Sequence, residues 1–191
     1  MNTQKNMNRF YIYLFIALAF SSCKEDRKNS EKSITDLIET EDTISDDSNG
    51  FFTLKINAAL GKDGDLTLFY LEEGQTKITR ENSVNIPVVG GENFQTLTFK
   101  IDKDILPSRL ILKFGNKEKS QTIVFNEVLI TYNDNEILIS KEDFFWNFNP
   151  NKFVDYDRTS FTATVAEKDG FSDPFFVSRI TLEDKMHLEL P

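Results

Sequence analysis

A period of two in hydrophobicity begins just after residue 50 and recurs along the rest of the chain. In its first stretch, apolar residues hold every second position: Phe52, Leu54, Ile56 and Ala58. Successive side chains of a strand point to opposite faces, so this pattern predicts a β-strand with one buried face. Helical periodicity is almost absent after residue 50, which excludes a doubly wound α/β fold and favours one made of strands.

Glycine, proline and asparagine divide this region into about nine short strands. We expect strands near residues 52–58, 66–71, 84–88, 95–101, 109–114, 121–132, 136–140, 160–166 and 175–182, with a possible edge strand at 186–190. Short strands with a turn signal roughly every dozen residues are typical of antiparallel sandwiches. We therefore predict an all-β antiparallel β-sandwich that occupies residues 50–191 as one domain.

Two of the expected strands have an irregular pattern. The second half of 66–71 is almost entirely apolar, which indicates a central strand covered on both sides. In 121–132 the apolar parity changes between Phe125 and Val128, and a bulge at Asn126-Glu127 would reconcile the two halves.

Burial must stabilise the domain, because the chain has one cysteine for any disulfide and one histidine. The same counts leave no His/Cys cluster for zinc. Eighteen phenylalanines and an aromatic content of 13% are ample for a β core. Representative positions that we predict for the core are Leu54, Ile56, Leu68, Leu97, Phe99, Leu112, Ile130 and Ile180.

The N-terminus has the layout of a secretory leader. Lys5 and Arg9 flank an unbroken apolar run over 10–20, which is shorter than the roughly 20 residues of a spanning helix. Ser21 and Ser22 then precede the only cysteine. This segment resembles the lipobox of bacterial lipoproteins, in which the leader is cut off just before a lipidated cysteine.

The lipobox resemblance implies a signal peptide at 1–22, a lipid on Cys23 and an anchored linker at 23–49. Lys24, Glu25 and Asp26 follow at once and resemble the lipoprotein export signal of Bacteroidota, which implies an outer-membrane protein displayed on the cell surface. An ordinary secretory cleavage site, or a thiol buried in a small amphipathic helix, is the alternative for Cys23.

Residues 24–49 are charged, rich in Ser and Thr, and poor in large apolar side chains, which is typical of a disordered tether. The precursor has a net charge of −9, and the leader contains two basic residues and no acid, so the mature chain has a charge of −11. A negative net charge argues against nucleic acid as a partner and against electrostatic binding to anionic lipid. The lipid at Cys23 remains as the expected membrane contact.

The strand sequences between residues 51 and 132 resemble a jelly-roll accessory domain that is attached to bacterial polysaccharide glycosyltransferases. The similar segments are 65–70, 83–88, 95–99, 110–115 and 123–130. The resemblance implies a jelly-roll-like sandwich and an association with carbohydrate. Lys113 departs from the pattern, in which an acid often precedes the Phe-Gly pair.

Residues 141–157 form an irregular stretch with many aromatic side chains. Trp146, Phe145 and Tyr156, together with Tyr132, are candidates for a platform that stacks on the C–H face of a sugar. Buried core is the alternative role for most of them. The same stretch brings together the oxygen ligands Asn149, Asn151, Asp155 and Asp157, for which calcium is a possible ion, although the spacing fits no calcium motif.

We therefore expect a surface lipoprotein whose sandwich binds polysaccharide as a non-catalytic or accessory module. The alternative is a structural or protein-binding component of the cell envelope. Catalysis is not expected: paired carboxylates arise by chance among 31 acids, and His187 lies next to the C-terminus. No cofactor other than a possible calcium ion is indicated.

Overall fold

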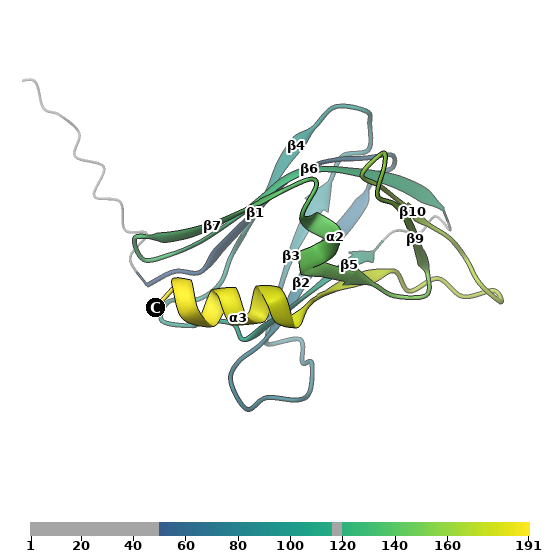
Figure 1. Ribbon diagram of the computed structural model, residues 1–191. Helices are drawn as coiled ribbons and strands as arrows, with labels where there is room; N and C mark the ends of the chain where they lie inside the picture. The colour runs from purple at the N-terminus through teal and green to yellow at the C-terminus, as the bar shows by residue number, and fades with distance from the viewer. Residues whose placement is uncertain (1–49, 116–119) are drawn as a thin grey trace, which may run out of the picture. The chain divides into compact units, whose positions relative to one another are not determined.

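A computed structural model describes residues 50–115 and 120–191 of the chain (Figure 1). The leader, Cys23, the Lys24-Glu25-Asp26 signal and the linker lie outside the described residues. The strands are β1 (Thr53–Leu60), β2 (Gly64–Leu71), β3 (Ser83–Val88), β4 (Gln95–Lys100), β5 (Arg109–Gly115), β6 (Gln121–Tyr132), β7 (Asn135–Ser140), β8 (Phe148–Pro150), β9 (Val154–Asp157), β10 (Thr162–Val165) and β11 (Phe175–Ser178). Within the described residues the helices are α2 (Phe144–Asn147) and α3 (Ile180–Glu189).

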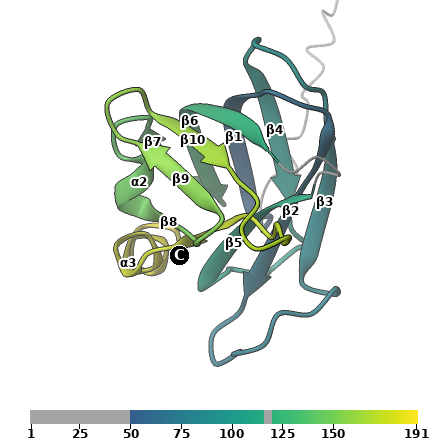
Figure 2. The ribbon, with the colours of Figure 1, turned by 90° about the vertical axis from the view of Figure 1, so that its right-hand side faces the viewer.

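The strands form two sheets in which every pairing is antiparallel. Sheet A has the order β4-β1-β6-β10-β9, with β7 also paired to β6, and sheet B has the order β3-β2-β5-β11-β8. Both ribbon views show the two sheets as separate layers (Figure 1, Figure 2). The prediction of an all-β antiparallel sandwich is confirmed.

The core lies between the sheets and is built by the alternation seen in the sequence. In β1 the side chains of Leu54 and Ile56 are buried, and in β2 those of Leu66 and Leu68 are buried. Seven of the eight representative core positions are at most 5% exposed: Leu54, Ile56, Leu68, Leu97, Phe99, Leu112 and Ile130. The eighth, Ile180, is 66% exposed, so its prediction was wrong.

The predicted bulge in β6 is present. Asn57 pairs with Glu127 and the next residue of β1, Ala58, pairs with Phe125, so Asn126 is the extra residue. This insertion lets Phe125 and Val128 both face the core although they lie on opposite parities.

The C-terminal region corrects two predictions of strands. Strand β11 ends at Ser178, and the chain then forms the helix α3 where an edge strand was expected at 186–190. Leu182, Met186 and Leu190 are four residues apart and fully buried, which is the spacing of one helical face. Ile180 begins the helix on its solvent side, which explains its exposure. The helix lies against β7 of sheet A and β11 of sheet B (Figure 1).

The irregular stretch at 141–157 contains α2, β8 and β9, and most of its aromatic rings lie in the core. The ring of Phe144 stacks on that of Phe125 with centroids 3.7 Å apart, and on that of Phe148 at 4.9 Å. These rings close the side of the sandwich where α2 contacts α3. In the part of the chain that the structure describes, neither helix has the length and apolar character needed to cross a membrane.

Candidate functional site

The outer face of sheet B has a strip of apolar side chains where solvent-facing residues are usually polar. The strand register places Phe69 of β2 opposite Ile111 of β5, and Ile111 opposite Val177 of β11. All three alternate with core residues, so they point away from the interior. Ser83 of β3 and Asn149 of β8 occupy the two ends of the same row.

This row explains the apolar second half of β2, which the sequence led us to interpret as a strand covered on both sides. Strand β2 is central in sheet B, as expected, because it lies between β3 and β5. Its outer face is not fully covered, however, because Phe69 remains partly exposed. On the same face Leu71 and Ile111 are only 6% and 7% exposed, so the prediction of a strand covered on both sides is largely confirmed. The apolar side chains that remain partly exposed line a surface groove.

Sheet A offers an internal comparison. Its corresponding central row contains Thr98, Lys55, Leu129 and Leu138, with an exposed lysine at the centre. The neighbouring row contains Lys100, Thr53, Thr131 and Glu136. The outer face of sheet A is therefore mixed, because Lys55 and Thr98 share its central row with Leu129 and with Leu138, which is 59% exposed. In sheet B, by contrast, three neighbouring strands place the apolar residues Phe69, Ile111 and Val177 side by side.

The apolar strip forms the floor of a groove of about 390 Å³, here called the sheet groove. Phe175 and Leu71 extend the floor, and Thr76 and Ile78 of the β2–β3 connection form one wall. Ile78 is 52% exposed, although isoleucine is usually buried. The groove therefore presents apolar surface to solvent from both its floor and its wall.

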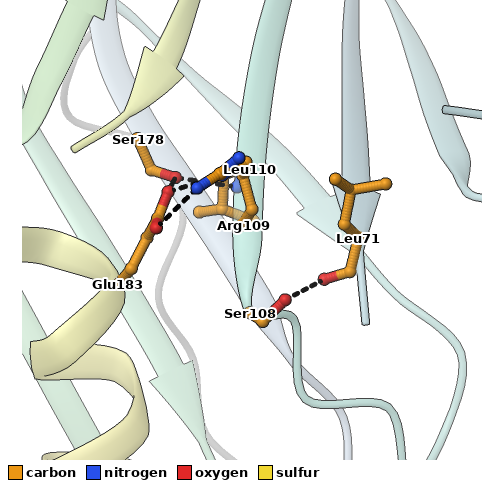
Figure 3. A network of polar contacts seen from close by, with 6 residues as sticks. All are labelled: Leu71, Ser108, Arg109, Leu110, Ser178 and Glu183. Atoms are coloured by element: carbon orange, nitrogen blue, oxygen red, sulfur yellow. Dashed lines mark hydrogen bonds and ion pairs between the residues drawn. The ribbon is translucent and has the colours of Figure 1, made fainter. Parts of the chain in front are cut away.

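Two ion pairs lie at the margins of the sheet groove. The Nζ atom of Lys113 lies 2.8 Å from Oδ1 of Asp173. Arg109 donates two hydrogen bonds to the carboxylate of Glu183 in α3, from Nε at 2.8 Å and from Nη2 at 3.0 Å (Figure 3). Arg109, Lys113 and Asp173 line the groove, so its margins offer hydrogen-bond donors and, at Asp173, an acceptor. The carboxylate of Glu183 is engaged by Arg109 and Ser178.

A buried network holds the Arg109 margin in place. The hydroxyl of Ser178 donates to the carboxylate of Glu183 at 2.9 Å and accepts a hydrogen bond from the backbone N–H of Leu110 at 3.0 Å (Figure 3). The hydrogen bonds to Glu183, and then its negative charge, raise the pKa of Arg109 above its ordinary value. The guanidinium therefore keeps its charge at any physiological pH.

The chemistry of the sheet groove suits a ligand with an apolar face and polar edges. A pyranose has this character, since its axial C–H groups pack on apolar rings and its hydroxyls donate and accept hydrogen bonds. A simple hydrocarbon would leave the marginal charges without hydrogen-bond partners from the ligand.

The structure brings together only part of the aromatic platform predicted from the sequence. Phe145 is 2% exposed and belongs to the core, so its ring offers no face to a ligand. Tyr132 lies at the tip of the β6–β7 hairpin, at the other end of β7 from the residues that lead into α2. Trp146 is 59% exposed, and the guanidinium of Arg158 lies over both Trp146 and Tyr156.

The predicted calcium ligands are occupied by other contacts. Asn149 accepts a hydrogen bond from Arg179, and the Asn151 side chain bonds backbone groups of Phe153, Asp173 and Phe175. Asp155 pairs with Lys168 at 3.6 Å, and Asp157 accepts from Thr159 and Ser160. Among residues 50–115 and 120–191, no three His, Cys, Asp or Glu side chains lie close enough to hold a metal ion. The geometry therefore gives the calcium site no support.

A recess of about 500 Å³ brings Ser108, His187 and Asp184 to one place, the residue types of a nucleophilic triad. Activation would need a hydrogen bond between the serine hydroxyl and the imidazole. The Ser108 hydroxyl instead donates to the carbonyl of Leu71 at 3.0 Å. The recess thus lacks the contact that would make Ser108 a nucleophile.

The sequence reasoning missed Phe69, Ile111 and Val177 as site residues. Their signal was present as apolar residues on the outward parity of three strands, a pattern that also fits a strand covered on both faces. Comparison with protein-family models, curated proteins and solved structures finds no match to this chain.

Proposed function

We propose that this protein is a cell-surface lipoprotein whose β-sandwich binds a glycan without cleaving it. The observation that carries the proposal is the sheet groove, in which Phe69, Ile111 and Val177 form an apolar floor between two ion pairs. Such a floor suits the C–H face of a sugar ring, and the ion pairs suit its hydroxyls. A groove of about 390 Å³ has room for a short stretch of a glycan chain.

The ion pairs also support binding rather than cleavage. A glycosidase needs one carboxyl group that donates a proton and a second that acts as nucleophile or base. The carboxylates of Asp173 and Glu183 each form an ion pair, with Lys113 and Arg109 respectively. Both carboxylates therefore already serve a structural contact, which favours binding over cleavage.

A test of binding begins with the mature protein, purified in detergent and applied to an array of neutral and acidic glycans. Calorimetry with the best ligand then compares wild type with Phe69→Ala, which removes one ring from the groove floor. One stacking contact contributes about 1 kcal/mol, so we expect a loss of affinity of roughly fivefold from a starting Kd between millimolar and micromolar.

The matched control is Leu129→Ala, because Leu129 is a partly buried outward residue of the central strand β6 in sheet A. A second pair, Lys113→Gln and Lys55→Gln, compares two strand lysines on the outer faces of the two sheets. If each groove variant lost no more affinity than its control on sheet A, the groove would not be the binding site. Failure of every glycan on the array to bind would contradict glycan binding itself.

The proposed location rests on the sequence near Cys23. We expect lipidation of Cys23, followed by transport to the outer face under the direction of Lys24, Glu25 and Asp26. Labelling with a radioactive fatty acid should be lost in Cys23→Ala. Replacement of the three signal residues by alanine should preserve the label but protect the protein from protease added to intact cells. Label on the Cys23→Ala protein, or unchanged protease access, would contradict the respective assignment.

The alternative function is binding of another envelope protein. The exposed side chain of Ile78 on the groove wall favours it, because apolar anchors are common in protein interfaces. The array distinguishes the two functions. Loss of an envelope partner in cross-linking of Ile78→Ser cells, together with an empty glycan array, would favour protein binding.

A further inference from the structure

Trp146, Tyr156 and Arg158 form an exposed cluster that is separate from the residues lining the sheet groove. Trp146 lies in α2, Tyr156 in β9 and Arg158 in the turn between β9 and β10. The three residues are here called the arginine cluster. Both aromatic members were candidates for sugar binding from the sequence, whereas Arg158 was not.

The guanidinium of Arg158 is held in a defined orientation. Its Cζ atom lies 4.5 Å from the ring centroid of Trp146 and 5.6 Å from that of Tyr156. Its Nη2 atom also donates a hydrogen bond to the hydroxyl of Tyr156 at 3.1 Å. Stacking and this hydrogen bond restrict the side chain before any ligand arrives, which reduces the entropy that binding would cost.

Contacts with the rest of the fold hold each part of the arginine cluster in place. The ring of Tyr156 stacks on the buried ring of Phe145, with centroids 4.3 Å apart. The carbonyl of Trp146 accepts a hydrogen bond from the hydroxyl of Thr181 at 3.0 Å. In the turn itself, Asp157 accepts hydrogen bonds from the Thr159 N–H at 2.8 Å and the Ser160 hydroxyl at 2.9 Å. Core packing and turn geometry therefore both position the arginine.

The charge of Arg158 has no acidic partner among the described residues, although the sequence has 31 acidic and 22 basic residues. The two acids that precede Arg158 in the chain have other partners: Asp155 pairs with Lys168, and Asp157 accepts hydrogen bonds from Thr159 and Ser160. A guanidinium has five N–H donors in its plane. One of them bonds Tyr156, and stacking uses the faces of the group, so most in-plane donors remain available for an anion.

We propose that the arginine cluster is a second binding site, and that it takes an acidic sugar, namely a pyranose with a carboxylate or a sulfate group. Arg158 receives the anionic group through a charge-assisted hydrogen bond, and Trp146, which is 59% exposed, offers apolar ring surface beside it. The choice of a sugar rests on the proposed function. The choice of an anion rests on Arg158 alone.

The net charge of −9 makes this preference unexpected from composition and therefore informative. Repulsion from distant acids is screened over about 8 Å at physiological ionic strength, whereas a direct contact with Arg158 is screened much less. Acid preference would thus be the signature of a local cation. It should weaken as salt is added.

The test uses the mature protein in detergent with three probes: an oligogalacturonate, its fully methyl-esterified form and a sulfated oligosaccharide of similar length. The ester keeps the sugar ring and removes the charge, so we expect the acid to bind about tenfold more tightly than the ester. The sulfated probe distinguishes selection for a carboxylate from selection for any anion. Stronger binding of either anionic probe than of the ester would support the proposal.

Three variants of the cluster and one control variant test whether the preference for acid arises there. Arg158→Gln should abolish the preference for acid, and Arg158→Lys should keep only part of it because lysine cannot stack or form a planar fork. Arg80→Gln is the matched control, because Arg80 is also an exposed arginine and does not belong to the cluster. Trp146→Ala should weaken binding of both acid and ester. Thermal unfolding of each variant checks that it is folded.

The outcomes separate this proposal from the proposed function. If the wild-type protein binds the ester as tightly as both anionic probes, the acidic-sugar site is overturned and glycan binding stays intact. A preference that survives in Arg158→Gln, or disappears equally in Arg80→Gln, also overturns it. Absence of binding to these probes and to the whole glycan array overturns both. The wild-type comparison decides the preference even where a variant does not fold.

Discussion

Arg109 and Glu183 form a bidentate ion pair that joins the outer face of β5 to the C-terminal helix across 74 residues of sequence (Figure 3). The arginine side chain is 49% exposed and the glutamate side chain 11% exposed. Their pairing fixes one margin of the sheet groove to α3. The helix is therefore part of the framework of the site as well as part of the core.

Ser178→Ala should destabilise the protein by about 1 to 3 kcal/mol, because it leaves the buried N–H of Leu110 without its hydrogen-bond acceptor. Ser108→Ala is the matched control. The carbonyl of Leu71, which accepts from the Ser108 hydroxyl, also accepts from the Ser108 backbone N–H at 2.8 Å and stays satisfied. Denaturant unfolding measures both, and an equal cost in the two variants would contradict this account of the network.

Phe145→Ala should cost about 3 to 5 kcal/mol in the free energy of unfolding, as expected for a buried aromatic ring. Trp146→Ala, at the next position of the same helix, should cost about 1 kcal/mol or less, since the ring is largely exposed and loses mainly its contact with Arg158. Chemical denaturation gives the free energy of unfolding of both variants and so distinguishes a core residue from a surface residue. A large cost for Trp146→Ala would show that Trp146 is structural and would weaken its assignment to a site.

The turn after β9 should open in acid. The backbone N–H of Thr159 and then the hydroxyl of Ser160 lower the pKa of Asp157 by hydrogen bonding to its carboxylate. A lowered pKa in the folded state means that this stabilisation is complete above the ordinary pKa of an aspartate and is lost as the pH falls through the lowered pKa.

An NMR titration of the Thr159 amide between pH 6 and 2 measures the opening of this turn. We expect the Thr159 shift to follow a midpoint below about 4, and Asp157→Asn to remove that transition. A midpoint at or above the ordinary aspartate value would contradict the hydrogen bonds assigned to Asp157.

The strands could be predicted from the sequence because the alternation of apolar and polar residues follows the alternation of buried and exposed side chains. Leu54 and Ile56 of β1 could be assigned to the core from their spacing, and the change of parity between Phe125 and Val128 located the bulge at Asn126. Alternation failed at the C-terminus. Met186 and Leu190 fit the face of a strand as well as that of a helix, and the buried Leu182 that decides for the helix lies outside the strand pattern.

The sheet groove could not be predicted from the alternation of apolar and polar residues. Alternation tells which face of a sheet Phe69, Ile111 and Val177 occupy, but not that β2, β5 and β11 are neighbours. The same limit applies to Arg158, whose position over Trp146 depends on how β9 and α2 meet. Aromatic residues of this stretch could be named from sequence as candidates, yet only the fold separates buried Phe145 from exposed Trp146.

The central claim is that glycan occupies the sheet groove, and an amide-resolved NMR titration with the best ligand from the array tests it most directly. We predict that the largest shift changes fall on Phe69, Ile111 and Val177, while Lys55 and Leu129 on the outer face of sheet A stay unchanged. Shift changes confined to sheet A, or spread evenly over both sheets, would contradict the claim.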